Sequence, residues 1–158
     1  MIALGLHSSF SLLQSPSSPR TLCQKVRHHG YKTAALTDIN NLYGLWPFLA
    51  ACREEGLTPI IGTEVRTAQH RLFCLVHDLT GYRNLCCLLT ALHCDPAFSL
   101  SSVLLSRHPG MTILVTDQHL LTFCRKIGAD VAAALVRKPD QHNSMLRRTA
   151  HRMGAPAV

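Results

Sequence analysis

The chain has 158 residues, of which 47% are hydrophobic and 16% are charged, and its formal net charge is +7. This length predicts a single domain over residues 1–158, and the apolar content excludes an intrinsically disordered chain. No segment approaches the roughly 20 consecutive apolar residues of a membrane helix, so we expect no membrane partner.

Short apolar strands alternate with amphipathic helices along the chain. The expected strands are Ile2–Leu6, Thr33–Thr37, Thr58–Gly62 with an extension through Val65, Arg71–Val76, Met111–Val115 and Val131–Val136. The first expected helix begins at Pro19 and ends before Gly30. The later ones are expected at Leu45–Glu55, Gly81–His93, Ser99–Ser106, from the cap Asp117 to about Lys126, and Pro139–Met153. Serine and proline favour helix starts and glycine favours helix ends, which sets the bounds of the first helix.

Repeated strand–helix–strand units with short connections favour a parallel sheet, either open or closed into a barrel. In both arrangements ligands bind at the carboxyl ends of the strands. The last residues, Ala155–Val158, look like the beginning of a further strand that the chain leaves unfinished. Such a strand would leave an open sheet edge, and we therefore expect some tendency to dimerise.

The N-terminus and the cysteines indicate a reducing, cytoplasmic location. Met1–Leu13 lacks the basic region of a signal peptide and contains polar residues where a signal peptide is apolar. The seven cysteines are odd in number, and no two of them form a CxxC pair. This pattern predicts buried thiols rather than a zinc ribbon or a disulfide framework.

Basic residues gather in two places along the chain. The two clusters contain Lys25, Arg27 and Lys32, and Arg147, Arg148 and Arg152, with histidines beside them. Such clusters suit a polyanion such as DNA, because each neutralised phosphate releases counterions. A solvated helix face explains each cluster equally well, and both interpretations stay open at this point.

A histidine and two carboxylates follow successive predicted strands. His7 follows the first strand, Asp38 the second and Glu64 the third. Imidazole and carboxylate together form a ligand set suited to zinc, manganese or iron. Each residue also has a structural interpretation: His7 as a hydrogen-bonding partner, Asp38 as a loop cap, and Glu64 as the ion-pair partner of Arg66 or Arg71.

Three segments carry a resemblance to a known family. LHSSFSLL, GYKTAALTDINNLYGLWPFLAACREEGLTPIIGTEV and HDLTGYRNLCCLLTALH closely resemble the start of bacterial C-family DNA polymerases, both the polymerase III alpha subunits and their error-prone relatives. The first domain of that family is the PHP domain (polymerase and histidinol phosphatase). The resemblance implies an α/β fold, a distorted barrel of strands and helices that is incomplete here at its C-terminus. Intact members hold up to three metals and hydrolyse phosphoesters, including as 3′–5′ exonucleases.

The resemblance transfers only part of the family's metal site. The matching positions are His7, Asp38, Glu64 and His93. The departures are Gly5 and Ile39 in place of histidines, Gln14 in place of an acidic residue or histidine, and Asp117-Gln118 in place of a Gly-Cys pair. The family's final Asp-x-His segment would fall after Val158. Phosphoester hydrolysis of this kind needs a metal-bound water and a cluster that clamps the leaving oxygen, so the lost ligands predict an inactive site.

These observations favour a domain with a degenerate metal site and a mainly structural or partner-docking role in DNA replication or repair. The resemblance implies that the rest of a polymerase chain, or replisome proteins, would be its partners, with DNA as a further candidate. The polymerase active site itself lies in a later domain of the family, and the sequence leaves open whether the chain is a fragment or a free-standing relic. The alternative is an active phosphoesterase or 3′–5′ exonuclease. In it the four matching residues hold Zn²⁺ or Mn²⁺, and His77 or His119 completes the site.

Overall fold

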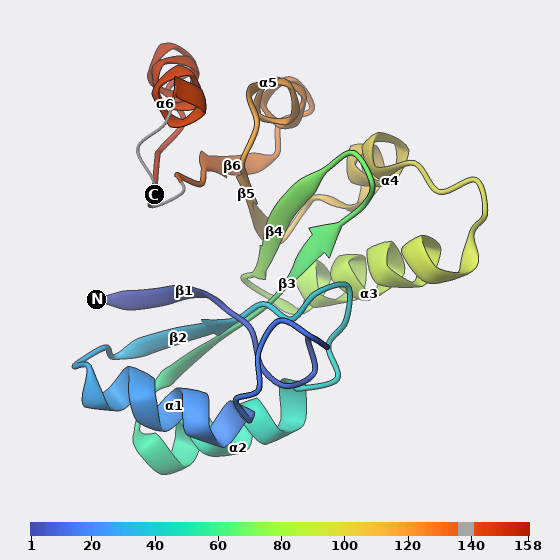
Figure 1. Cartoon of the computed structure of the whole chain (residues 1–158). Coiled ribbons are helices and arrows are strands. Elements are labelled where there is room, and N and C mark those ends of the chain that lie inside the picture. The colour runs from blue at the N-terminus through green and yellow to red at the C-terminus, as the bar shows by residue number, and fades with distance from the viewer. Residues whose placement is uncertain (136–140) are drawn as a thin grey trace. The chain divides into compact units, whose positions relative to one another are not determined.

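A computed structural model describes residues 1–135 and 141–158 (Figure 1). The chain divides into two compact units, Met1–Ala68 and Gln69–Val158. Each unit combines strands and helices, as expected for an α/β protein. The expectation that residues 1–158 form a single domain stays a prediction.

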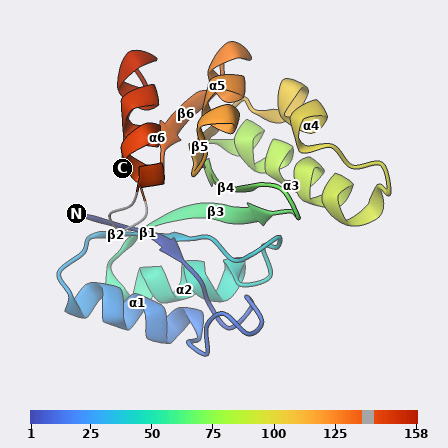
Figure 2. The same ribbon diagram turned by 45° about the horizontal axis from the view of Figure 1, so that its top comes forward.

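The first unit is a parallel three-stranded sheet with two helices. Its elements are β1 (Ile2–Leu6), α1 (Pro19–His28), β2 (Thr33–Leu36), α2 (Leu45–Glu55) and β3 (Thr58–Arg66). Both pairings, of β1 with β2 and of β2 with β3, are parallel. The two helices cover the same face of this sheet (Figures 1 and 2). The strands lie in the sheet in the order β1–β2–β3, which is also their order along the chain.

Local signals in the sequence account for the two helices of the first unit. The side chain of Ser18 accepts a hydrogen bond from the Thr21 N–H, and Pro19 occupies the first helical position of α1. Gly56 ends α2 with a φ of 65°, a conformation that glycine adopts without steric cost. The buried faces of the helices include Cys23, Phe48 and Cys52, which pack with residues of β2 into one apolar core.

The described residues of the second unit form three strands and four helices. Its elements are β4 (Arg71–Val76), α3 (Leu79–Cys94), α4 (Leu100–Arg107), β5 (Met111–Val115), α5 (Gln118–Lys126), β6 (Asp130–Ala133) and α6 (Gln141–Arg152). Strands β5 and β6 are parallel, and α5 connects them. Among the described residues, no helix is long and apolar enough to cross a membrane.

The expectation of a parallel sheet is wrong for β4 and β5, which pair antiparallel with Val76 opposite Met111. The reason is that two helices, α3 and α4, connect these strands. One crossover helix returns the chain to the start of the next parallel strand, whereas α4 carries it back to the end where β4 finished. The His77 N–H closes this connection by donating to the Gly110 carbonyl over 2.9 Å.

The predicted element bounds agree with the structure to within two residues where both are described. Helix α3 begins at Leu79 rather than at Gly81, because the Asp78 side chain caps it by accepting from the Gly81 N–H over 2.8 Å. Val136 at the predicted end of β6, and Pro139 at the predicted start of α6, lie outside the described residues.

The last residues of the chain run parallel to β6. The Ala133 N–H donates to the Pro156 carbonyl and the Val158 N–H donates to the Ala133 carbonyl, each over 2.8 Å. The segment expected to begin a strand therefore does extend the sheet of the second unit. Dimerisation through this edge stays a prediction.

A close backbone contact in the second unit makes one glycine essential. A Cβ atom on Gly81 would lie 1.8 Å from the Gly110 carbonyl oxygen. We expect Gly81→Ala to lower the free energy of unfolding by about 3 kcal/mol, since the backbone itself must move. Gly128→Ala is the matched control: its φ is +76° but nothing lies within 4 Å of the added Cβ, so about 1 kcal/mol is expected. Urea unfolding of both variants checks this, and equal losses would contradict the close contact.

Candidate functional site

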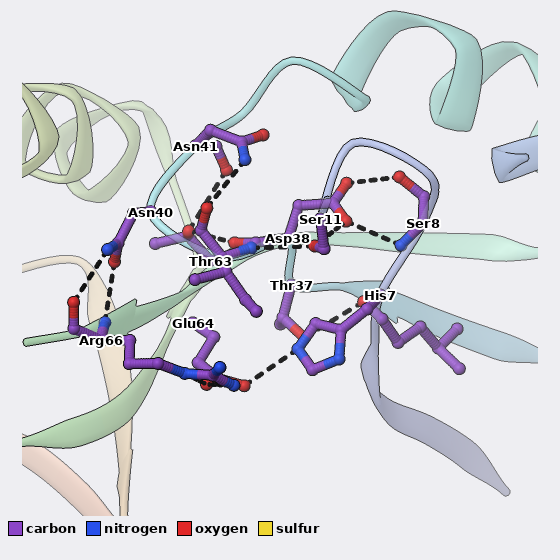
Figure 3. A network of polar contacts seen from close by, with 12 residues as sticks. His7, Ser8, Ser11, Thr37, Asp38, Asn40, Asn41, Thr63, Glu64 and Arg66 are labelled. Carbon is purple, nitrogen blue, oxygen red and sulfur yellow. Dashed lines mark hydrogen bonds and ion pairs between the residues drawn. The ribbon is translucent and has the colours of Figure 1, made fainter. Parts of the chain in front are cut away.

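The candidate site of the first unit lies where β1 and β2 end beside β3. His7 follows β1 directly, and Asp38 follows β2 after one further residue. Glu64 lies inside β3, whose pairing with the second strand's end continues through a bridge between Ile39 and Glu64. The structure thus brings together three of the four predicted ligands (Figure 3).

Asp38 is held by neutral hydrogen-bond donors from the loop after β1. Its Oδ1 accepts from the Ser8 N–H over 2.7 Å and from the Ser11 hydroxyl over 2.6 Å, and its Oδ2 accepts from the Ser8 hydroxyl over 2.6 Å. Asp38 is 1% exposed, and both serines are buried as well. We call this arrangement the Asp38 clasp. It ties the loop after β1 to the end of β2.

The backbone around Asp38 is fixed against β3. The Thr63 hydroxyl donates to the Asp38 carbonyl over 2.5 Å. Asn40 adopts a φ of 54°, a left-handed conformation that asparagine tolerates better than most residues. Its side chain makes two hydrogen bonds to the Arg66 backbone, of 2.8 and 2.7 Å. The segment after β2 therefore has little freedom to move relative to β3.

Glu64 is a fully buried carboxylate between two basic side chains. Its Oε1 accepts from Arg66 Nε over 2.7 Å and pairs with Arg66 Nη2, and its Oε2 lies 2.9 Å from His7 Nε2. The side chains of Glu64, His7 and Arg66 are 0%, 19% and 37% exposed. A buried carboxylate requires such compensation, because an unpaired charge is costly away from water. We call these three residues the Glu64 triad.

Gly44 and Gly5 show how the backbone shapes this site. A Cβ on Gly44 would lie 2.8 Å from Asp38 Oδ2, so the clasp excludes a side chain there. Gly5 has a φ of +71° and lies where the pairing of β1 with β2 shifts register, as in a β-bulge. The resemblance puts a histidine ligand at Gly5, and a histidine in this conformation would cost about 1–2 kcal/mol of strain.

An open hollow of about 420 Å³ lies beside the clasp. Two of its lining residues, Gln14 and Ile39, are positions where the family has ligands. Phe10 and Tyr43 line it too, and Arg66 forms part of its wall. The hollow is therefore lined mainly by apolar and neutral polar groups.

The remaining predicted ligands belong to the second unit. His93 is exposed in the last turn of α3, and His119 is exposed in α5, which Asp117 caps. His77 Nε2 lies 2.5 Å from the Thr112 hydroxyl and 3.8 Å from the carboxylate of Asp130. Across the described parts of the chain, no group of three or more His, Cys, Asp or Glu side chains could hold a metal ion.

The sequence predicts the ion-pair partner of Glu64 but not the hydrogen-bond donors to Asp38. The ion pair of Glu64 with Arg66 is one of the two pairings that the sequence left open, and the structure shows it. The roles of Ser8 and Ser11 were not foreseen, although both serines stand in the loop that follows the first strand. Serine is common in loops, so only the position of Asp38 across the sheet reveals what these hydroxyls do.

Solved structures of similar fold match this chain over nearly its whole length. One is a protein from Bifidobacterium adolescentis assigned as a metal-dependent phosphoesterase, with a TM-score of 0.69 and 14% sequence identity. The other is an amidohydrolase from Chromobacterium violaceum, with the same TM-score and identity. Each comparison covers 99% of this chain and 84% of the other. These likenesses concern the fold alone and define its class, which is α/β.

Sequence comparison identifies the family. Residues 4–155 match the PHP domain, and the chain belongs to the PHP domain family. The DNA polymerase III subunit alpha of Chlamydia pneumoniae is 37% identical over 106 residues, which are 58% of this chain and 8% of that protein. The error-prone DNA polymerase of Anaeromyxobacter sp. (strain K) is 37% identical over 102 residues, which are 61% of this chain and 9% of that protein. The chain thus spans about a tenth of the length of these polymerases. The expected α/β fold of PHP type is confirmed.

The Asp38 clasp leads to a prediction about stability. We expect Asp38→Ala to lower the free energy of unfolding by about 3 kcal/mol, because three buried donors lose a charged acceptor. Asp117→Ala is the matched control, since Asp117 only caps α5 by accepting from the Leu120 N–H, and it should cost about 1 kcal/mol. Chemical denaturation measures both variants. A loss at Asp38 no greater than that at Asp117 would contradict the clasp.

Proposed function

We propose that this PHP domain is a structural and partner-docking part of a bacterial DNA polymerase of the polymerase III alpha or error-prone type, with a degenerate metal site. Its partners are the remainder of a polymerase chain or replisome proteins in the cytoplasm. The similarity to a part of such polymerases supports the setting. The observation that carries the degenerate site is the Glu64 triad, in which Arg66 contacts the carboxylate of a predicted ligand.

Arg66 supplies the positive charge that a metal ion would supply in an intact site. A divalent cation at Glu64 would meet the guanidinium, which is permanently charged, and would have to displace it. The guanidinium contacts Oε1 of Glu64 through both Nε and Nη2, and hydrogen bonds between charged groups are stronger than those between neutral groups. The buried carboxylate is therefore compensated without a metal.

The other donors do not fit a metal cluster. Both oxygens of Asp38 already accept hydrogen bonds from Ser8 or Ser11. Ile39 provides no donor atom, and a histidine at Gly5 would be strained. Catalytic zinc sites use three protein ligands with an open position for water. His7 and the two carboxylates would have to exchange their present partners to provide this, so we derive no catalytic step from a metal here.

The alternative is an active phosphoesterase with Zn²⁺ or Mn²⁺ at His7, Asp38, Glu64 and His93. One observation favours it: a protein of similar fold is assigned as a metal-dependent phosphoesterase. The Arg66 side chain is also 37% exposed, so it has solvent into which it can turn. The two functions differ in whether the purified chain retains metal.

Metal content and hydrolysis decide between these functions. After dialysis, we expect elemental analysis to find well below one equivalent of zinc or manganese per chain. We also expect no release of nitrophenol from bis(nitrophenyl) phosphate when Mn²⁺ is added. Two or three equivalents of metal, with hydrolysis that His7→Ala abolishes, would establish the alternative.

A double variant tests the proposal that Arg66 prevents a metal ion from binding at Glu64. Arg66→Met together with Ile39→His removes the guanidinium and restores one family ligand. Zinc binding by this double variant should exceed that of the wild type, as measured by calorimetry. Arg20→Met with Ile39→His is the matched control, because the guanidinium of Arg20 is paired with Glu54.

We further propose that the two basic clusters lie beside DNA. Lys25, Arg27 and Lys32 are exposed, and residues 1–32 contain no aspartate or glutamate. The exposed Arg147, Arg148 and Arg152 belong to a stretch, residues 141–158, that also lacks acidic residues. Clustered exposed basic side chains attract phosphates over a distance of about 10 Å at moderate salt.

The salt dependence of DNA binding tests this proposal. Each phosphate contact contributes about 0.9 to the slope of log K against log salt concentration. Replacing Lys25, Arg27 and Lys32 by glutamine should reduce the magnitude of this slope by about 2 to 3 in a fluorescence anisotropy titration with duplex DNA. Arg20→Gln is the control, because Arg20 is paired with Glu54. An unchanged slope in the triple variant would remove the first cluster from the interface.

A further inference from the structure

Two cysteines from different helices meet in the core of the first unit. Cys23 lies on α1 and Cys52 on α2, and their sulfur atoms are 3.6 Å apart, within thiol hydrogen-bonding distance. The two residues are 0% and 1% exposed. Among the cysteines, all of which lie in the described part of the chain, this is the one pair that the structure shows in sulfur–sulfur contact.

We propose that Cys23 and Cys52 form a reversible disulfide when the protein meets a hydroperoxide. In the first step the Cys23 thiol gives up its proton and the thiolate attacks one peroxide oxygen. The O–O bond breaks, Cys23 becomes a sulfenic acid, and the other oxygen takes up the proton and leaves as water or an alcohol. In the second step the Cys52 sulfur attacks the Cys23 sulfur and water leaves with the Cys52 proton. The two thiols are oxidised by two electrons, and the peroxide is reduced by two.

The two thiols differ in their pKa values, and this difference supports the proposed roles. The hydrogen bond with Cys52 lowers the pKa of the Cys23 thiol from its usual value, and the same hydrogen bond raises the pKa of Cys52. The thiolate is the nucleophile in such chemistry, and the lowered pKa of Cys23 supports it as the attacking residue, with Cys52 3.6 Å away as the resolving one. Because both are buried, the reaction needs a small oxidant and a transient separation of α1 from α2.

The other buried thiols provide a contrast. Cys74 and Cys124 lie in the second unit, and burial raises the pKa of each to about 12. Such thiols hold their protons at neutral pH and behave as apolar core residues. Burial alone therefore does not make a cysteine of this protein reactive, and the distinguishing feature of Cys23 is the 3.6 Å contact of its sulfur with that of Cys52.

The disulfide would join the two helices that flank the Asp38 clasp. Helix α1 begins just after the loop that carries Ser8 and Ser11. Helix α2 begins directly after Gly44, whose Cα lies against Asp38. A cross-link between Cys23 and Cys52 would therefore limit the opening of the first unit around its polar site. This inference does not depend on the proposed function, since it concerns the core and not the metal ligands.

The test uses the full chain with its three more accessible cysteines, Cys86, Cys87 and Cys94, replaced by serine. The protein is exposed to hydrogen peroxide in native buffer, its remaining free thiols are alkylated under denaturing conditions, and its peptides are mapped by mass spectrometry. We expect a linked pair of peptides containing Cys23 and Cys52, two hydrogen atoms lighter than their sum, which dithiothreitol separates. The oxidised protein should melt about 10 °C higher, because the cross-link closes a loop of the unfolded chain.

Two cysteine variants test the two steps of disulfide formation. Cys52→Ser should stop the reaction at a Cys23 sulfenic acid, which dimedone labels, whereas Cys74→Ser should leave disulfide formation unchanged. Should Cys52→Ser fail to fold, the peptide map of the parent protein decides alone. Full alkylation of Cys23 and Cys52 after peroxide treatment would overturn the inference. So would a disulfide that appears only when urea is present during oxidation.

Discussion

The structure of the first unit depends on how one buried carboxylate is compensated. Glu64 lies inside β3 with no exposure to solvent, where an isolated charge would be costly. In an intact site of the family a metal would lie against such a carboxylate, and here the guanidinium of Arg66 contacts it instead. His7 lies within hydrogen-bonding distance of the other carboxylate oxygen of Glu64, so the Glu64 side chain also connects the loop after β1 to β3.

The Asp38 clasp extends the same principle to the second carboxylate. Three donors from Ser8 and Ser11 satisfy a charge that is almost completely buried. Together, clasp and triad connect the ends of β1 and β2 to each other and to β3 through side chains. We propose that these side chains serve the stability of the fold. This combination is what we propose for a domain that supports a polymerase without hydrolysing phosphoesters itself.

Much of this could be predicted from the sequence, because helix caps, glycine stops and apolar periodicity act locally. The bounds of α1, α2 and β4 follow from such signals. The pairing of β4 with β5 could not be predicted, since its direction depends on how α3 and α4 fold back on each other. The ligands His7, Asp38 and Glu64 were predicted as neighbours because parallel strands end at a common edge. The Ser8 and Ser11 contacts and the meeting of Cys23 with Cys52 depend on residues distant in sequence, and spacing carries no signal for them.

The most direct test of the central claim is a crystal structure of the protein soaked in Mn²⁺, with anomalous data collected at the manganese edge. We expect Arg66 to stay paired with Glu64 and no anomalous peak to lie between His7, Asp38 and Glu64. A manganese ion bound by these three residues, with Arg66 turned away from Glu64, would contradict it.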